Sequence, residues 1–265
     1  MSVLLFVDML GVNSRWRLSG RDGAELAFRQ FRALVNGAIA KTTERDSIRG
    51  SIESDAVAIV SESCSLAVKI GLRLFRDAFL SPVQDGGHRF WLRGVIVPWS
   101  GGEFIRRTVP GVESPTHGLD IVEYSPALLD AIATERSGFK GMRLLIHREL
   151  VTPELRTTCS VSVGQKKVPL FMQLRLSQYP ERIDRLFADV LWMAADNESD
   201  WEGMKTLLSR RLSRSTKENE EFLHAAATQV VFNECGGRML RVRRRQGLAV
   251  PRYSKAIKKA RRSMG

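Results

Sequence analysis

The sequence predicts a mixed α/β (α+β) fold in which helices pack against a mostly antiparallel sheet. Two observations predict it. Over the first two thirds of the chain, short apolar runs typical of strands alternate with longer segments of helical spacing. Beyond them the spacing is helical, which predicts a C-terminal helical extension. A chain of 265 residues with 43% apolar and 26% charged residues can bury a sizeable core and is too apolar for wholesale disorder.

The first part of the chain predicts a strand, a helix, a hairpin and a second helix. The predicted elements are a strand at 2–8, a helix at 22–41, a hairpin formed by 46–52 and 56–62, and a helix at 64–80. The first strand is a compact apolar run that ends at Asp8. In both helices apolar residues recur at three- and four-residue spacing. The two runs of the hairpin meet at the polar turn Glu53-Ser54-Asp55.

The middle and end of the chain predict further strands and then helices. The predicted elements are a strand at 88–98, a helix at 117–135, strands at 142–147 and 167–176, and helices at 181–196, 201–213 and 217–235. Pro126 is an anomaly inside the first of these helices and marks either a kink or a restart. The order of elements is the βαββαβ plan, which is ferredoxin-like at its centre.

Basic residues are concentrated at the C-terminal end of the chain. Eleven of its 41 lysines and arginines lie in 236–265, which holds no acidic residue, so the rest of the chain has 30 basic and 29 acidic residues. We therefore expect a domain at 1–178, a helical extension at 179–235 and a basic tail at 236–265, helical or partly disordered. The tail could bind nucleic acid through phosphate contacts or dock on an acidic partner. Its single aromatic residue, Tyr253, argues against base stacking, so nucleic acid is not the favoured partner.

Apolar runs and cysteines indicate the compartment. The longest early apolar run, Val3 to Val7, has five residues, whereas a membrane helix needs about 20, so neither a membrane span nor a signal peptide is expected. The three cysteines, Cys64, Cys159 and Cys235, form no CxxC pair. A disulfide framework is not expected, and a cytoplasmic location fits.

Two carboxylates stand where this fold plan would bring them together. Asp8 ends the first strand and Asp55 lies at the tip of the hairpin that should pair with it. Taken alone, each is more often an ordinary turn residue. Two adjacent carboxylates repel each other unless a cation lies between them, and such oxygen sites suit Mg²⁺ or Mn²⁺. Two ions bridged by two carboxylates support displacement at phosphorus. Backbone N–H groups of the following turn could cradle a triphosphate. That turn consists of Met9, Leu10, Gly11, Val12 and Asn13.

The ordered set of motifs resembles a known family. Asp8 followed by Gly11, Asp55 in a hairpin, and Leu92-Arg93-Gly94-Val95-Ile96 in the next long strand resemble the class III nucleotidyl cyclase catalytic domain. Within that superfamily the chain is most similar to the bacterial pyrimidine cyclases of the Pycsar antiphage systems. The resemblance covers roughly residues 1–155.

The resemblance implies a metal-dependent cyclase. Such enzymes bind a nucleoside triphosphate with two divalent ions, Mn²⁺ or Mg²⁺, held here by Asp8, Asp55 and the backbone carbonyl of Met9. The ribose 3′-hydroxyl attacks the α-phosphate, and pyrophosphate leaves. Active sites lie between the subunits of a homodimer. Pycsar enzymes make cyclic UMP or cyclic CMP, which activates a separate effector.

Two further residues are candidates for the substrate site. Strand alternation places Ser51, Glu53 and Asp55 on one face, so Ser51 would face the base if Asp55 faces the metals. Purine cyclases commonly have a lysine there, and a small polar residue allows a pyrimidine, with UTP favoured over CTP. Arg93 lies mid-strand in an apolar setting. It is either paired with a core carboxylate or a catalytic clamp on the phosphate or base.

One departure from the family keeps two other functions open. Purine cyclases carry an asparagine and, four residues on, an arginine that stabilise charge on the α-phosphate. Neither stands in the corresponding region, 118–124, where Ala127 follows near the expected arginine. Arg93, Arg106 or Arg107 would have to replace them. The alternatives are a noncatalytic cyclase-like domain that senses nucleotides and a nucleic-acid-binding protein acting through the basic tail.

Overall fold

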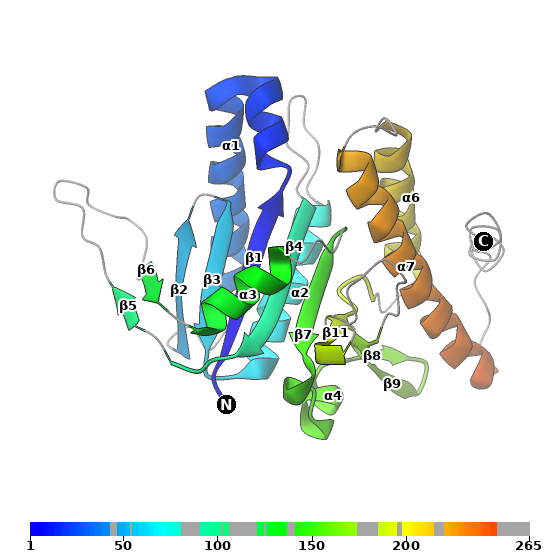
Figure 1. Ribbon diagram of the computed structural model, residues 1–265. Coiled ribbons are helices and arrows are strands. Elements are labelled where there is room, and N and C mark those ends of the chain that lie inside the picture. The colour runs from blue at the N-terminus through cyan, green and yellow to red at the C-terminus, as the bar shows by residue number, and fades with distance from the viewer. Residues whose placement is uncertain are drawn as a thin grey trace.

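The computed structural model shows a central sheet with helices on both faces (Figure 1). It describes residues 1–42, 47–53, 55–80, 91–101, 103–105, 121–124, 126–136, 141–173, 185–194, 198–214 and 220–247. The strands are β1 (Val3–Leu10), β2 (Ile48–Glu53), β3 (Ala56–Ser61), β4 (Trp91–Pro98), β5 (Glu103–Ile105), β6 (Ile121–Tyr124), β7 (Arg143–His147), β8 (Ser160–Val163), β9 (Lys166–Pro169), β10 (Phe171–Met172) and β11 (Phe187–Val190). The helices are α1 (Val12–Ala40), α2 (Cys64–Leu80), α3 (Pro126–Arg136), the 3-10 helix η2 (Arg148–Leu150), α4 (Pro153–Thr158), α6 (Glu198–Arg214) and α7 (Glu220–Arg245).

Seven strands form the main sheet, in the order β10-β11-β7-β4-β1-β3-β2. Each neighbouring pair is antiparallel except β4 and β7, which are parallel. Two small sheets, β5-β6 and β8-β9, lie beside it. The predicted α+β class with a mostly antiparallel sheet is therefore confirmed.

The first strand lies between β3 and β4 and is buried on both faces because helices cover the two sides of the sheet. Val3, Leu5 and Val7 join the larger apolar core with α1 and α2, whereas Leu4 and Phe6 join a second core under α3. Helix α3 crosses the face of the sheet that is toward the viewer in Figure 1, and α2 lies behind it. The alternation of side chains along the strand thus determines which of the two cores each side chain of β1 joins.

The strand at 2–8, the hairpin and the helix at 64–80 are confirmed as β1, β2–β3 and α2. The first helix starts earlier than predicted, at Val12, and bends at Gly20, whose φ of 63° and ψ of −162° are not helical. Glycine adopts such positive φ values without steric cost. Helical spacing of apolar residues becomes regular only after this bend, so the sequence pattern predicted only the part of α1 that follows Gly20 (Figure 1).

Two predicted helices contain strands instead. Within 117–135, residues 121–124 form β6 and α3 begins at Pro126, so the proline marks a restart at the first helical position, where its missing N–H costs nothing. Within 181–196, residues 187–190 form β11, which pairs with β7. Pairing with a neighbouring strand overrode weak local spacing at both places. Residues 117–120, 181–184, 195 and 196 lie outside the described residues.

The other predicted elements differ less from the observed ones. The strand at 167–176 is divided into β9 and β10, which belong to different sheets, and residues 174–176 lie outside the described part. The strand at 88–98 is described from Trp91, where β4 begins. The helices at 201–213 and 217–235 are confirmed as α6 and α7.

The basic tail begins as a helix. Helix α7 continues through Gly236 and Gly237 to Arg245, and residues 248–265 lie outside the described residues. The division into 1–178, 179–235 and 236–265 stays a prediction, although β11 of the central sheet lies beyond residue 178.

Helix α7 is fixed to the start of β7 by buried polar contacts. The Gly141 N–H donates to Nδ1 of His224 at 3.2 Å, and the Met142 N–H donates to Oγ1 of Thr228 at 2.9 Å. Trp192 Nε1 donates to the Met142 carbonyl at 2.9 Å. These three bonds satisfy buried backbone groups before the start of β7, and the two from Gly141 and Met142 hold α7 in place. In the described part of the chain, no helix has both the length and the apolar run that crossing a bilayer requires.

Candidate functional site

Asp8, near the end of β1, lies beside the β2–β3 turn that holds Asp55. Asp8 is opposite Ala56 in the antiparallel β1–β3 pair. The next residue of β1, Met9, donates its N–H to the carbonyl oxygen of Asp55 at 2.7 Å. Asp55 therefore lies in the β2–β3 turn directly against the end of β1. Two residues 47 positions apart in the sequence are brought together here by strand pairing alone.

Arg93 flanks Asp8 on its other side. The β1–β4 register places Asp8 opposite Arg93, and Nη2 of Arg93 lies 3.6 Å from Oδ2 of Asp8. The side chains of Arg93 and Asp8 are 15% and 20% exposed, so the contact is largely shielded from water. This is the ion pair with a core carboxylate that was one of the two interpretations of Arg93. The contact also places a guanidinium beside the carboxylate that is the first metal candidate.

Ser51 lies on the same face of the sheet as Asp8. It is opposite Ala58, which is opposite Phe6, two residues before Asp8 in β1. Ser51 is 6% exposed. Strand spacing places its backbone roughly 12 Å from that of Asp8. The alternation argument does not extend to Asp55, because β2 ends at Glu53 and Asp55 lies in the turn, where the pleat does not fix direction.

The predicted phosphate turn divides into a strand end and a helix start. Met9 and Leu10 belong to β1 and their side chains are buried in the core, so only their backbone groups could contact a ligand. The Met9 N–H is already donated to Asp55, which removes it from the expected N–H cradle.

The rest of that turn begins α1. Gly11 has φ +81°, which glycine adopts freely, and Val12 and Asn13 open the helix. Gly11 supplies no side-chain cap, and the first turn of α1 holds no acidic residue. The first amides of a helix have no partner within it and carry partial positive charge, so the opening of α1 suits an anion.

The donor set fits a hard divalent cation. The Asp8 and Asp55 carboxylates and the Met9 carbonyl are the oxygen ligands that Mg²⁺ and Mn²⁺ prefer. Among the described residues, no group of three or more His, Cys, Asp or Glu side chains could hold a metal. A metal here would therefore take its remaining ligands from water and phosphate, as Mg²⁺ commonly does.

A second arginine extends the charged row and was missed by sequence reasoning. Arg143 on β7 is opposite Arg93 in the parallel β4–β7 pair. Its Nε and Nη2 donate to the two carboxylate oxygens of Asp189 on β11, at 2.6 and 2.7 Å. Both side chains are buried. Asp189 fell in a predicted helix, so nothing in the sequence pattern pointed to this pair. Arg106 and Arg107 lie outside the described residues, and Ala127 is buried in the first turn of α3.

Comparisons with known proteins give structural likenesses alone. No protein-family model matches the chain, and no curated protein sequence matches it. The guanylyl cyclase domain of the RhoGC fusion protein from the aquatic fungus Blastocladiella emersonii has a TM-score of 0.48 at 12% identity, over 72% of this chain and 94% of that chain. A monomeric adenylate cyclase structure from Trypanosoma brucei has a TM-score of 0.42 at 15% identity, over 63% of this chain and 85% of that one.

A third likeness is to the GGEEF domain of a diguanylate cyclase from Vibrio cholerae. Its TM-score is 0.31 at 10% identity, and the match covers 36% of this chain and 60% of that chain. The three structures are nucleotide cyclases by name. Because the TM-scores and sequence identities are low, the fold and the candidate site are assigned from the strand order and the residues of this chain.

Proposed function

We propose that this chain is a metal-dependent nucleotide cyclase that converts UTP, or less favourably CTP, to the 3′,5′-cyclic nucleotide and pyrophosphate. The observation that carries the proposal is the bond from the Met9 N–H to the Asp55 carbonyl, next to Asp8. This bond holds the backbone of Asp55 against the end of β1 that carries Asp8, beside the start of α1, and we infer from it that the two carboxylates can share a metal.

The chain's residues would act as follows. Asp8, Asp55 and the Met9 carbonyl would hold two Mg²⁺ or Mn²⁺ ions, which when bound neutralise triphosphate charge and favour loss of the 3′-hydroxyl proton. The backbone from Gly11 to Asn13 would bind phosphate oxygens. Arg93 would turn from Asp8 to the α-phosphate, where a fixed guanidinium stabilises developing charge. The 3′-oxygen bonds to the α-phosphorus, the bond to the bridging oxygen breaks, and pyrophosphate leaves.

The pyrimidine preference rests on Ser51. Its small polar side chain lies on the same face as Asp8 and is uncharged, where purine cyclases commonly have a lysine. By resemblance to the Pycsar cyclases, the enzyme would be a homodimer with active sites at the interface, and its cyclic product would act on a separate effector in antiphage defence.

Turnover tests this proposal directly. The purified chain is incubated with each of the four ribonucleoside triphosphates and Mn²⁺ or Mg²⁺, and pyrophosphate and cyclic products are quantified by mass spectrometry. We expect cyclic UMP to predominate, and none above background from the Asp8→Asn variant. Absence of pyrophosphate release from all four triphosphates would refute the catalytic proposal.

A noncatalytic nucleotide-sensing domain is the second candidate. The Asp8–Arg93 contact at 3.6 Å favours it, because a carboxylate engaged by a guanidinium is less available to a metal. Binding of UTP, with or without metal, and no release of pyrophosphate would identify this function.

A further inference from the structure

A cavity of about 800 Å³ lies between the β9–β10 segment and the last turns of α7. Its size is typical of small-molecule sites, which occupy about 300–1,000 Å³. It is far from Asp8: three strands, β11, β7 and β4, separate β10 from β1 in the main sheet. Four strand spacings amount to roughly 19 Å. The cavity is therefore separate from the candidate catalytic site.

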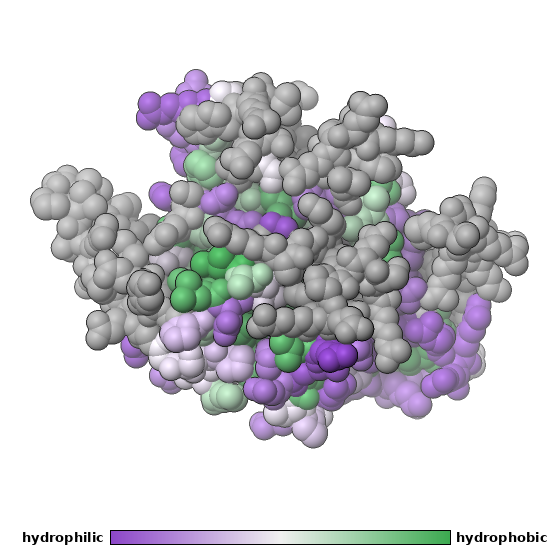
Figure 2. Space-filling model, in the orientation of Figure 1, coloured by the Kyte–Doolittle hydropathy of each residue, from purple (hydrophilic) through white to green (hydrophobic). Residues whose placement is uncertain are grey.

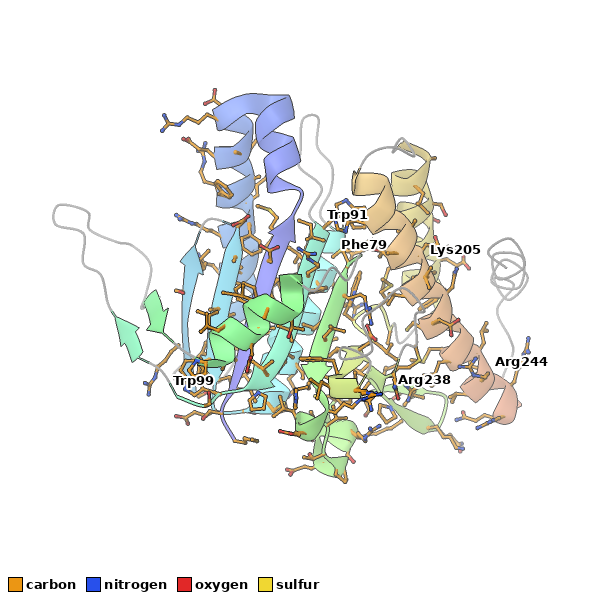
Figure 3. All side chains as sticks on the ribbon, in the orientation of Figure 1. Phe79, Trp91, Trp99, Lys205, Arg238 and Arg244 are labelled. Carbon is orange, nitrogen blue, oxygen red and sulfur yellow. The ribbon has the colours of Figure 1, made fainter. Side chains whose placement is uncertain are left out.

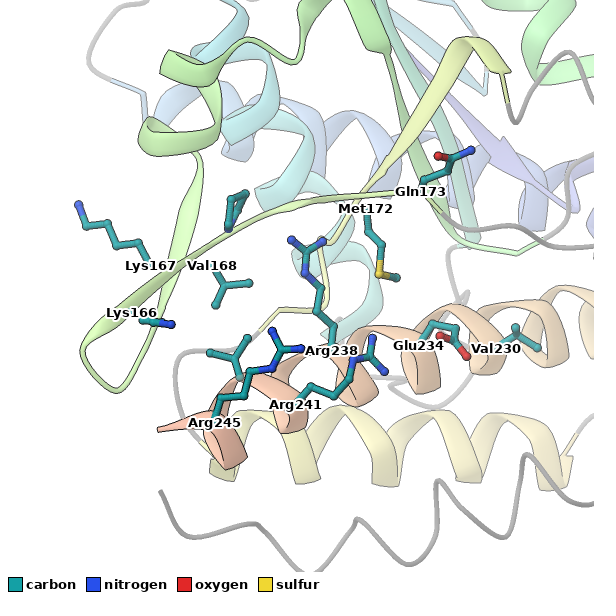
Figure 4. A pocket seen from close by; sticks show the side chains of 12 residues that line it. Lys166, Lys167, Val168, Met172, Gln173, Val230, Glu234, Arg238, Arg241 and Arg245 are labelled. Atoms are coloured by element: carbon teal, nitrogen blue, oxygen red, sulfur yellow. The ribbon is translucent and has the colours of Figure 1, made fainter. Parts of the chain in front are cut away.

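Its lining is strongly basic. Five cationic side chains and one carboxylate line it: Lys166, Lys167, Arg238, Arg241, Arg245 and Glu234. The three arginines are spaced by three and four residues, which places them on one face of α7. Figure 4 shows the guanidinium groups of Arg238 and Arg245 gathered between α7 and β9, while Lys167 points away from the helix. In Figure 2 hydrophilic residues gather at the lower right, where β9 and the end of α7 lie in Figure 1.

Arg238 is held in place before any ligand binds. Its Nη1 donates to the Phe171 carbonyl at 2.6 Å, across the cavity from its own helix. Burial lowers the pKa of Arg238; Cys235 raises it, and the nearby Arg156 and Arg241 lower it further. Crowding of half-buried positive charge is unfavourable until an anion offsets it. A preordered guanidinium also loses little freedom on binding.

We propose that this cavity binds a small molecule that carries two or more adjacent phosphate groups. Arginine forks bind phosphate oxygens in pairs, and three of them on one helix face match a run of phosphates. Val168 and Val242 add an apolar wall for the remainder of the ligand. A nucleic-acid strand is less well matched, because the described lining residues include no aromatic side chain on which bases could stack.

Calorimetry with inorganic tripolyphosphate tests the site in the absence of metal. Titrations in EDTA exclude metal-dependent binding through the Asp8 site, and the probes are tripolyphosphate, UTP and a 20-nucleotide single-stranded RNA. Arg241→Gln and Arg245→Gln should each weaken tripolyphosphate binding about tenfold or more, since each removes a charge-assisted contact. Arg244→Gln is the matched control: it removes the same charge from the same turn, but Arg244 does not line the cavity and projects away from the protein (Figure 3).

Two results would support the proposal and three would overturn it. Equal affinity for tripolyphosphate and UTP would indicate that phosphates alone are recognised, and tighter UTP binding would indicate a nucleotide. An equal loss in Arg244→Gln would show that only net charge matters. If RNA binds but tripolyphosphate does not, the surface is a nucleic-acid site. If none of the probes binds, the cavity is not an anion site. Because metal is absent and the Arg241 and Arg245 variants change only the cavity, none of these outcomes depends on the cyclase proposal.

Discussion

Arg93 and Asp8 lie opposite each other on β4 and β1, with Nη2 and Oδ2 3.6 Å apart. On the other side of Arg93, Arg143 on β7 makes a much shorter contact, 2.6 Å from Nε to Oδ1 of Asp189. Two arginines on adjacent strands repel each other, so each is directed to its own carboxylate. The Arg143 pair is buried and bidentate, whereas the Arg93 contact is longer and partly exposed. Of the two arginines, Arg93 makes the weaker contact with its carboxylate, so we expect it to change partner more readily than Arg143.

Replacement of Arg93 should damage turnover more than stability. We expect Arg93→Gln to lower kcat by about 100-fold or more, as loss of one donor to a developing oxyanion does. Its unfolding free energy should fall by about 1–3 kcal/mol, because Asp8 loses a charged partner. Steady-state kinetics and urea unfolding measure the two effects. Arg49→Gln, on an exposed residue of β2, is the control and should change neither. Normal kcat with lowered stability would make Arg93 purely structural.

Asp8→Asn and Asp55→Asn should each abolish turnover and metal binding without unfolding the chain. Each variant removes one negative charge and one metal oxygen while it keeps the side-chain shape. Loss of even an outer-shell partner costs about 10–100-fold in metal affinity, so loss of a ligand should cost at least as much. Electron paramagnetic resonance of free Mn²⁺ reports the affinity and circular dichroism reports the fold. Asp130→Asn, on an exposed face of α3, should bind and turn over as wild type. Wild-type Mn²⁺ affinity in Asp55→Asn would contradict the ligand assignment.

The sequence analysis was more accurate for the half of the sheet that holds the candidate site than for the other half. Val3 to Val7 and the β2–β3 hairpin are marked by continuous apolar runs and a polar turn, and these local signals place Asp8 beside Asp55. The four-residue strand β11 carries no such signal, because it is specified by pairing with β7 and by the Asp189–Arg143 contact. Contacts between distant segments leave little local pattern, so both that ion pair and the α7 cavity became visible only in three dimensions.

Removal of one partner of the buried Arg143–Asp189 pair should lower the unfolding free energy strongly, whereas replacement of both partners by apolar residues should lower it little. Asp189→Asn leaves a buried guanidinium without its countercharge, and we expect a loss of about 3–5 kcal/mol in unfolding free energy. The double variant Arg143→Met/Asp189→Leu removes both charges and should recover most of that loss. Urea unfolding of the wild type, both single variants and the double variant gives the coupling energy. A double variant as unstable as the sum of the two single variants would contradict this.

Close approach of α7 to the sheet predicts that Gly141 cannot carry a side chain. Gly141 has φ +85°, and a Cβ there would lie 2.8 Å from the Thr228 backbone nitrogen and 3.0 Å from the Ala227 Cβ. Gly141→Ala should therefore displace α7 and cost more than the about 1–2 kcal/mol of the positive φ alone. Gly247→Ala is the control, since Gly247 has φ +66° and no atom within 4 Å of an added Cβ. Similar losses of unfolding free energy in both variants would show that α7 accommodates the methyl group.

Stability at alkaline pH should depend on the buried thiol of Cys235. Burial raises its pKa from the ordinary 9.0 to about 12, and nearby Arg238 offsets only part of this rise. Between these pH values the unfolded chain loses the thiol proton while the folded chain keeps it, so the unfolded state binds fewer protons and stability falls as pH rises. The fall attributable to Cys235 should be about 1.4 kcal/mol per pH unit at most.

Comparison with Cys235→Ala isolates this contribution, because all other titrating groups are common to both proteins. Below pH 9 the variant should be less stable by about 1 kcal/mol, since it loses a buried sulfur. As the pH rises toward 12 the difference should shrink and reverse, because only the wild type exposes a thiol on unfolding, and ionisation of that thiol stabilises its unfolded state. Cys64→Ala gives a matched test: burial raises the pKa of Cys64 only to about 11, so its effect should saturate one pH unit earlier. Parallel stability curves for the wild type and Cys235→Ala from pH 8 to 11 would mean that the Cys235 thiol ionises as readily in the folded chain as in the unfolded one.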